Sequence, residues 1–306
     1  MLVSVIIPTY NRAKTIERTV NSVLAQTWKA IEIIVVDDGS TDQTPEVLHR
    51  YGDKIRVIRQ KNGGPAAARN TGIKAATGDI ISFLDSDDLW LPDKTERQMR
   101  LIQAGESSGV ICCVCSCRMN FVAGPLDSFK YQGLYPAERE GIWTNPADFL
   151  VHRFFLFNQV VSVRREALLQ AGLFREDLPF GLNDDYDLSV RLSLIGPWSF
   201  ITDPLVEWYE HPGNISRTHS QLAVCTQTLQ ILEQINSSPR FRERMPQGRL
   251  NQRLWLLSTK IRALGLSNGS NMLSRLLGKS ILLYLRGYEA VFRRLPSTHR
   301  MITRPL

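Results

Sequence analysis

Apolar and polar positions alternate in blocks along the first hundred residues. Short runs rich in Val and Ile, such as "VSVIIP" at 3–8 and "IEIIVVDD" at 31–38, are separated by segments with helical spacing. Nearly continuous β-branched residues are typical of strands that are covered on both faces. The order predicts crossover units and a doubly wound α/β fold with a mostly parallel sheet. The other predicted strands are 55–60 and 79–85, and the predicted helices are 15–26, 44–51 and 65–76.

Polar residues follow three of the predicted strands at the point where each strand ends. In an open sheet of this kind, ligands bind beyond the carboxyl ends of the strands, so these residues are candidates for a binding site. They are Pro8 to Tyr10, Asp37 to Ser40, and Asp85 to Asp87.

Asp85 and Asp87 are candidates for a metal site. Side chains two apart in an extended segment point the same way, so both carboxylates are expected to converge on one point. Converging carboxylates repel each other unless a cation lies between them, and oxygen ligands suit Mn²⁺ or Mg²⁺. Such an ion would in turn hold the diphosphate of a nucleotide. The alternative is an acidic turn that ends the strand and caps a helix near Asp93.

The segment 61–78, "KNGGPAAARNTGIKAATG", joins two predicted elements. Two glycines allow a tight turn, the proline suits the first position of a helix, and Lys61, Arg69 and Asn70 place donors near the start of that helix. A helix N-terminus with basic neighbours can bind an anion. The same pattern also occurs in ordinary junctions between a loop and a helix.

The net charge of the 306-residue chain, +7, is unevenly distributed. From Pro239 onward there are fourteen Lys or Arg residues against Glu243 and Glu289, a net charge of +12, so the first 238 residues carry −5. A nucleic-acid-binding protein would explain the basic tail. Its main body, however, would not be acidic, and no recognition motif is present. We therefore expect no nucleic-acid partner.

No apolar run reaches the roughly 18 residues that a membrane-spanning helix needs, and no secretory leader pattern precedes the first apolar run. These observations predict a cytoplasmic protein. No histidine partner accompanies the cysteines of "VICCVCSC", and they are interpreted as small apolar residues of a buried strand. They are Cys112, Cys113, Cys115 and Cys117.

Five motifs together resemble a known family. The stretches "VSVIIPTYNR", "VVDDGSTD", "NGGPAAARNTGI", "FLDSDD" and "GLNDDYDLSVRL" have the order and spacing seen in family 2 glycosyltransferases. Enzymes of this family have the GT-A fold, use nucleotide-diphosphate sugars and invert the anomeric carbon. The resemblance covers about residues 2–216, so it implies a catalytic domain at 1–216 and leaves 217–306 as a basic helical extension.

The resemblance also implies roles for individual residues. Pro8, Tyr10 and Asp38 would hold the nucleoside, with Arg69 near the nucleotide. Asp87 would be the principal ligand of Mn²⁺ or Mg²⁺, with Asp85 near the ribose or the metal and Ser86 beside it. His211 would be a third metal ligand or a phosphate contact, although a lone loop histidine can equally be structural.

An inverting transfer also needs a base that takes the proton of the acceptor hydroxyl. The family usually has Glu-Asp where this chain has Asp184 and Asp185, so Asp185 is predicted to be the base and Asp184 is the second catalytic candidate. Both acidic residues would also favour the start of the helix that follows.

These features predict an inverting glycosyltransferase with a UDP-sugar as the expected donor. The acceptor would be a hydroxyl of a glycan or a lipid-linked molecule, in the synthesis of cell-surface polysaccharide or glycolipid. A metal-dependent sugar nucleotidyltransferase is the alternative, but it would carry a Gly-rich basic motif where this chain has "PTYNR". The sugar, the acceptor and the linkage depend on pocket geometry, which the motifs do not define.

The tail contains an amphipathic pattern at 271–294. One stripe is predicted to be mainly apolar, and a basic stripe is expected opposite it. The first stripe consists of Leu273, Leu276, Leu277, Ser280, Tyr284, Tyr288, Val291 and Leu295. A basic amphipathic helix can lie on an anionic membrane, which would make the enzyme peripheral on the cytosolic membrane face. The alternative is a helix packed on the catalytic domain. The basic stripe is Arg275, Lys279, Arg286 and Arg293.

Overall fold

The structure is a computed structural model. It describes residues 1–121, 124–127, 138–151, 156–178, 183–211, 214, 219–268, 271–294 and 303–304, with the backbone alone at 126, 287–294 and 303–304. The predicted aliphatic, basic and aromatic positions beyond 286 therefore lie outside the described side chains.

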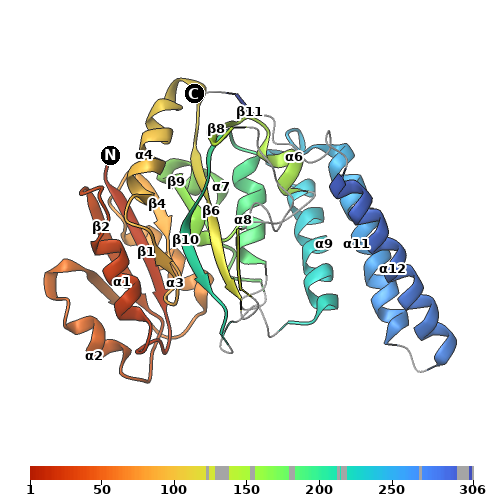
Figure 1. Cartoon of the computed structure of the whole chain (residues 1–306), viewed down its shortest axis with the longest axis horizontal. Coiled ribbons are helices and arrows are strands. Elements are labelled where there is room, and N and C mark those ends of the chain that lie inside the picture. Colours follow the sequence, from red (N-terminus) through yellow and green to blue (C-terminus); the bar gives the residue numbers. More distant parts are fainter. Residues whose placement is uncertain are drawn as a thin grey trace.

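The N-terminal half is a parallel sheet with crossover helices, as the hydrophobic pattern predicts (Figure 1). Strands β3, β2, β1 and β4 lie side by side in that order, and all three pairings are parallel. Buried β-branched side chains fill β1 and β2 because helices cover the sheet. The elements are β1 (Val3–Thr9), α1 (Ile16–Leu24), β2 (Ile31–Asp37), α2 (Thr44–His49), η1 (Gly52–Lys54), β3 (Arg56–Arg59), α3 (Pro65–Ala75) and β4 (Ile80–Phe83).

Beyond β4 the sheet becomes mixed. Strand β9 (Val161–Arg164) runs antiparallel between β4 and β6 (Cys112–Phe121), whereas β6 and β10 (Trp198–Tyr209) are parallel. The path continues through β8 (Glu140–Trp143) to the short β11 (Thr303–Arg304). The other elements here are β5 (Leu89–Trp90), α4 (Lys94–Ala104), η2 (Glu106–Ser108), β7 (Gly124–Asp127), α6 (Pro146–Leu150), η3 (Asn158–Val160), α7 (Arg165–Ala171) and α8 (Asp184–Ser193).

The cysteines of β6 are buried between the sheet and its helices, which confirms their interpretation as small core residues. Burial raises the pKa of the Cys113 thiol to about 12 and that of Cys115 to about 11, so both stay neutral at physiological pH. Lys94 and Gln98 of α4 are buried in the same layer.

The described residues 219–268 and 271–294 of the C-terminal part are mainly helical, as predicted, whereas Thr303–Arg304 form strand β11 of the sheet. The hydrophobic core continues from the sheet into α9 (Gln221–Ser237) and α11 (Gln247–Ser267), through side chains such as Ile231 and Leu257. The short α10 (Pro239–Arg242) joins these two helices. The proposed boundary at 216 therefore separates sequence patterns, whereas the core is continuous across it.

Helices α11 and α12 (Met272–Arg294) lie side by side at the end of the molecule away from the first strands (Figure 1). Close packing between them depends on Gly278, because a Cβ atom there would lie 2.4 Å from the Ser267 nitrogen and 2.6 Å from the Ala263 oxygen. No helix in the described ranges is both long enough and apolar enough to cross a membrane.

Candidate active site

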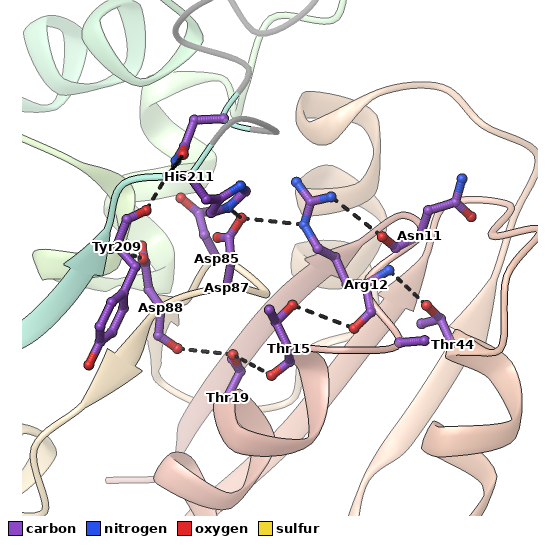
Figure 2. Close-up of polar contacts among 12 residues, drawn as sticks. Asn11, Arg12, Thr15, Thr19, Thr44, Asp85, Asp87, Asp88, Tyr209 and His211 are labelled. Atoms are coloured by element: carbon purple, nitrogen blue, oxygen red, sulfur yellow. Dashed lines mark hydrogen bonds and ion pairs between the residues drawn. The ribbon is translucent and has the colours of Figure 1, made fainter. Parts of the chain in front are cut away.

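The loops that follow β1 and β2 are joined by hydrogen bonds (Figure 2). Asn11 has a positive φ of 53°, and its side-chain oxygen accepts from the Thr41 N–H at 2.8 Å. The Arg12 N–H donates to the Thr44 hydroxyl at 2.8 Å. These contacts hold the ends of the two parallel strands together at the edge of the sheet where ligands are expected.

Asp38 is buried at the end of β2 and holds the glycine-rich loop. Its Oδ1 accepts from the Gln60 side chain at 2.7 Å and the Gly63 N–H at 3.0 Å, and its Oδ2 accepts from the Gly64 N–H at 2.8 Å. Donors of the protein therefore already occupy most of the lone pairs with which the Asp38 carboxylate could accept hydrogen bonds from a nucleobase. Tyr10 is 43% exposed, so its ring is accessible to a ligand. Pro8 lies in β1 opposite Val36.

Arg69 connects the two acidic motifs. It is only 6% exposed, and it donates from Nη2 to Asp85 and from Nη1 to Asp184, both at 2.8 Å. Its guanidinium also lies over the Phe174 ring, 5.3 Å from the centroid. Arg69 therefore joins the end of β4 to the start of α8. Arg69 and Asp184 are 115 residues apart along the chain.

The prediction that Asp85 and Asp87 converge through an extended segment is wrong. Strand β4 ends at Phe83, and the following residues form a turn in which the Asp88 N–H donates to the Asp85 carbonyl at 3.1 Å. The turn sends the two carboxylates to different partners. Asp85 pairs with Arg69, whereas Oδ2 of Asp87 lies 2.8 Å from Nε2 of His211 and 3.3 Å from Nε of Arg12 (Figure 2). Ser86, between them, is 7% exposed.

The fold therefore brings His211 into contact with Asp87, the predicted metal ligand. A loop histidine with a purely structural role would not need this contact. Asp87 and His211 offer a carboxylate and an imidazole within one hydrogen-bond length, and Asp85 is two residues from Asp87 along the turn. Among the residues that the structure describes, no three His, Cys, Asp or Glu side chains already surround one point at which a metal ion could sit. The donor types fit a divalent cation, and Asp85 would have to leave Arg69 to join them.

Asp184 and Asp185 begin α8 in different electrostatic surroundings. Asp184 is held by Arg69. Asp185 accepts a bond from the Tyr186 N–H at 2.8 Å, but burial and the neighbouring charge of Asp184 raise its pKa to about 8. Asn183 precedes them with a φ of 59°, and its side chain donates to Thr228 on α9 instead of capping α8. A raised pKa makes a carboxylate a stronger base, so Asp185 is the better suited of the two to accept a proton.

Four polar residues of this region were missed by sequence reasoning. Arg12 pairs with Asp87, Arg18 donates to the Asp87 carbonyl at 2.7 Å, Gln60 binds Asp38, and Asp88 is buried beside the turn. Two of them had a signal, because Arg12 belongs to "PTYNR" and Asp88 to "FLDSDD". Gln60 and Arg18 stand in no such motif.

The mixed sheet with flanking helices and acidic groups at its strand ends defines the GT-A class of fold. S. aureus TarS, in the structure with UDP-GlcNAc, has the same fold with a TM-score of 0.68 and 20% identity over 93% of this chain and 80% of that one. Pyrobaculum calidifontis mannosyltransferase PcManGT, in complex with GDP-Man and Mn²⁺, has a TM-score of 0.56 and 21% identity over 97% of this chain and 84% of that one.

The family follows from sequence comparison. The model of glycosyl transferase family 2 matches residues 4–163, so the chain belongs to this family of transferases. A Bacillus subtilis relative, the uncharacterized glycosyltransferase EpsJ, is 51% identical over 200 residues, which are 61% of this chain and 55% of that protein. Matches to other curated relatives span between 15% and 66% of the relatives' own length. The resemblance drawn from the five motifs is thus confirmed at the level of family and fold.

Proposed function

We propose that this chain is a metal-dependent, inverting glycosyltransferase that moves a sugar from a UDP-sugar to a hydroxyl group of a glycan or lipid-linked acceptor. The observation that carries the proposal is the arrangement around Arg69. One buried guanidinium joins the acidic turn after β4, where a nucleotide diphosphate would bind, to the acidic start of α8, where a base is needed. The diphosphate of the donor and the base for the acceptor would then lie on the two sides of Arg69.

The donor side is supported by the strand ends. Tyr10 is accessible beside the loops held by Asn11 and Asp38, and it would stack on the base, with Pro8 beneath it. The related folds agree in kind, since TarS was solved with UDP-GlcNAc and PcManGT with GDP-Man. Oδ2 of Asp38 accepts one hydrogen bond, from the Gly64 N–H, and its second lone pair would accept a hydrogen bond from the nucleobase.

The metal would be held by Asp87 and His211, because Asp85 is paired with Arg69 and would have to leave it to become a further ligand. A bound Mn²⁺ or Mg²⁺ supplies positive charge that stabilises the diphosphate as it leaves. Carboxylates suit both ions, and an imidazole ligand favours Mn²⁺. Arg12 lies 3.3 Å from Asp87 on the side of the β1 loop, so its guanidinium is close enough to contact a phosphate of the donor.

Asp185 would act as the base. It takes the proton from the acceptor hydroxyl while the oxygen forms a bond to the sugar C1 and the bond from C1 to the diphosphate oxygen breaks. The attack comes from the face opposite the diphosphate, which inverts C1. Arg69 keeps Asp184 as its carboxylate partner, so the acceptor proton is left to Asp185.

Residues 1–216 would form the catalytic domain and 217–306 an extension that places it at the cytosolic face of an anionic membrane. Helix α12 packs on α11 through small and aliphatic positions such as Gly278, yet it exposes large apolar side chains. Residues three and four apart on a helix are neighbours, so exposed Arg275 and Lys279 lie beside Met272, Leu276 and Leu283. These three apolar residues are 72%, 52% and 70% exposed. The cationic row thus lies next to an apolar row and not opposite it as the sequence pattern predicted, and this arrangement also fits an anionic lipid surface.

The test is a screen of UDP-sugars and GDP-mannose with Mn²⁺, Mg²⁺ or chelator, measuring release of the nucleoside diphosphate. We expect release that depends on the metal and on one donor, and loss of metal-dependent donor binding in Asp87→Asn with an unchanged melting temperature. Asp93→Asn is the matched control, because Asp93 is a half-exposed carboxylate that precedes α4 and pairs with Arg97. In a parallel assay with UTP and a sugar 1-phosphate, formation of a UDP-sugar with release of pyrophosphate would instead indicate a nucleotidyltransferase. Full metal-stimulated binding by Asp87→Asn would refute the assignment of Asp87.

A further inference from the structure

Asp88 lies next to the proposed metal ligand Asp87, but its carboxylate has different partners, Tyr209 and Gln159. The residue is 1% exposed. Its Oδ1 accepts from the Tyr209 N–H at 3.1 Å, and its Oδ2 accepts from the side-chain amide of Gln159 at 2.9 Å. A buried carboxylate with an N–H donor on each oxygen is suited to holding chain segments together.

The backbone around Asp88 is also held from a third side. The Asp88 carbonyl accepts from the Thr19 hydroxyl at 3.0 Å (Figure 2). Arg18 donates to the Asp87 carbonyl at 2.7 Å, and its guanidinium lies 4.6 Å from the centroid of the Tyr209 ring. Helix α1, the acidic turn and the end of β10 therefore meet at this point.

The segment that Asp88 holds carries His211. Strand β10 ends at Tyr209, and His211 follows two residues later with Nε2 at 2.8 Å from Oδ2 of Asp87. The Asn214 side chain forms two hydrogen bonds within this segment. It accepts from the His211 N–H and donates to the Tyr209 carbonyl at 3.3 Å. Once the Tyr209 backbone is fixed, the reach of the imidazole toward Asp87 is fixed as well.

We propose that Asp88 is a positioning residue for the donor site. It fastens the end of β10 to the acidic turn, so that His211 and Asp87 face one another where the diphosphate and its metal would bind. The proposal rests on the proposed function, because the pair has this use only in a metal-dependent transferase. It attributes the role of Asp88 to its two accepted hydrogen bonds and not to its negative charge.

Two substitutions separate hydrogen bonding from charge. In Asp88→Asn, the amide oxygen keeps the bond from Tyr209, and the amide NH₂ can donate to Gln159 once that side chain turns over. Oε1 of Gln159 is buried and has no hydrogen-bond partner within the described ranges, so it can accept that bond. Asp88→Ala removes both acceptors and leaves two buried N–H groups unsatisfied.

The first measurement uses the full chain without any ligand. Hydrogen exchange of the Tyr209 amide and the ¹⁵N shifts of the His211 ring are compared in the wild type, Asp88→Asn and Asp88→Ala. We expect Asp88→Asn to resemble the wild type, and Asp88→Ala to exchange the Tyr209 amide at least about tenfold faster with changed ring shifts, as one lost hydrogen bond implies. Wild-type exchange and ring shifts in Asp88→Ala would overturn the proposal. Asp88→Ser replaces Asp88→Ala should the latter not fold.

The second measurement is the affinity for UDP in the presence of Mn²⁺, by calorimetry. Asp88→Ala should weaken it about tenfold and Asp88→Asn less than about threefold. In a His211→Ala background, Asp88→Ala should add almost nothing, because both changes remove the same contact. Equal losses in the Asn and Ala variants, or additive losses in the double variant, would overturn the proposal. Failure of the wild type to bind UDP with Mn²⁺ would instead contradict the proposed function, and the measurement without ligand would still decide the role of Asp88.

Discussion

Arg69 and Lys94 are both buried cations, and their surroundings differ in one respect. Burial opposes the charge of Arg69, but Asp85 and Asp184 outweigh burial and raise the pKa of the guanidinium. Lys94 is fully buried with no such carboxylate among the described residues, and burial lowers its pKa to about 8. Its amine donates to Oε1 of Gln98 at 2.7 Å and lies 3.7 Å from the centroid of the Trp90 ring.

This difference shows which kind of buried charge indicates a functional site. A cation between two carboxylates holds both acidic groups in place. In the proposed reaction, each of these acidic groups has a chemical use. A lone buried amine is held by packing, by one amide oxygen and by the face of a ring, so it costs stability without ordering other charged groups. We therefore propose that Arg69 belongs to the catalytic site, whereas Lys94 is part of the core.

The largest effect is expected at the acidic residue that Arg69 leaves unpaired. Asp185→Asn should lower kcat by about 10³-fold with little change in donor affinity, because the loss falls on the acceptor proton in the transition state. Asp184→Asn is the matched control and should keep more activity. Single-turnover kinetics together with donor titration check this, and an inactive Asp184→Asn beside a normal Asp185→Asn would reverse the two roles.

The pH dependence of the same residue gives a related prediction. Burial and Asp184 raise the pKa of Asp185 to about 8, and a base must be deprotonated to act. The rate kcat/KM should therefore fall as the pH drops below about 8 and level off above it. In Asp185→Asn this acidic limb should disappear from the residual activity. A limb that persists unchanged in the variant would assign it to another group.

Removing Arg69 should affect stability as well as activity. Arg69→Met leaves Asp85 and Asp184 without their partner, and breaking a buried ion pair in this way costs about 3–5 kcal/mol of unfolding free energy. We expect a smaller loss here at low pH, because protonation of the abandoned carboxylates relieves it. Urea unfolding at two pH values measures this. An equally stable Arg69→Met at neutral pH would contradict the comparison with Lys94.

Lys94→Met should change the free energy of unfolding in the opposite direction to Arg69→Met. The folded-state pKa of about 8 lies below the ordinary value of 10.5, so the unfolded chain binds more protons between these values and wild-type stability should rise with pH there. Removing the amine should stabilise the protein by up to about 3 kcal/mol at pH 7, and by little at pH 10. Gln98 keeps a donor in Ser162 at 2.7 Å. The exposed Lys74→Met is the control, and a variant less stable than the wild type at pH 7 would show that Lys94 stabilises the core.

The smallest effect is expected for cations that have no buried partner. Lys279 on α12 is exposed beside apolar residues, and Lys279→Gln should weaken binding to vesicles with anionic lipid by about 1 kcal/mol, or roughly fivefold. Added salt should weaken wild-type binding too. Leu276→Ser tests the apolar row, and the exposed Lys54→Gln is the control. Binding that ignores lipid charge, salt and both substitutions would refute membrane docking by α12.

The sequence by itself determined the order of elements in the first half and the motif positions at the strand ends. Periodicity is a local property, because a strand covered on both faces must be apolar at successive positions, and β1, β2, α3 and β4 follow the predicted ranges closely. The family could be recognised for the same reason, since five short motifs keep their order along the chain.

Contacts between distant segments were decided only by the tertiary structure. The turn after Phe83 sends Asp85 toward Arg69 and Asp87 toward His211, and nothing in "LDSDD" specifies that separation. The raised pKa of Asp185 depends on how deeply the start of α8 is buried. Likewise, the side of α12 that faces α11 is set by the close contact at Gly278, which leaves Leu276 and Leu283 exposed. Such contacts depend on how helices and strands pack in three dimensions, and a local pattern in the chain carries no information about the partner it will meet.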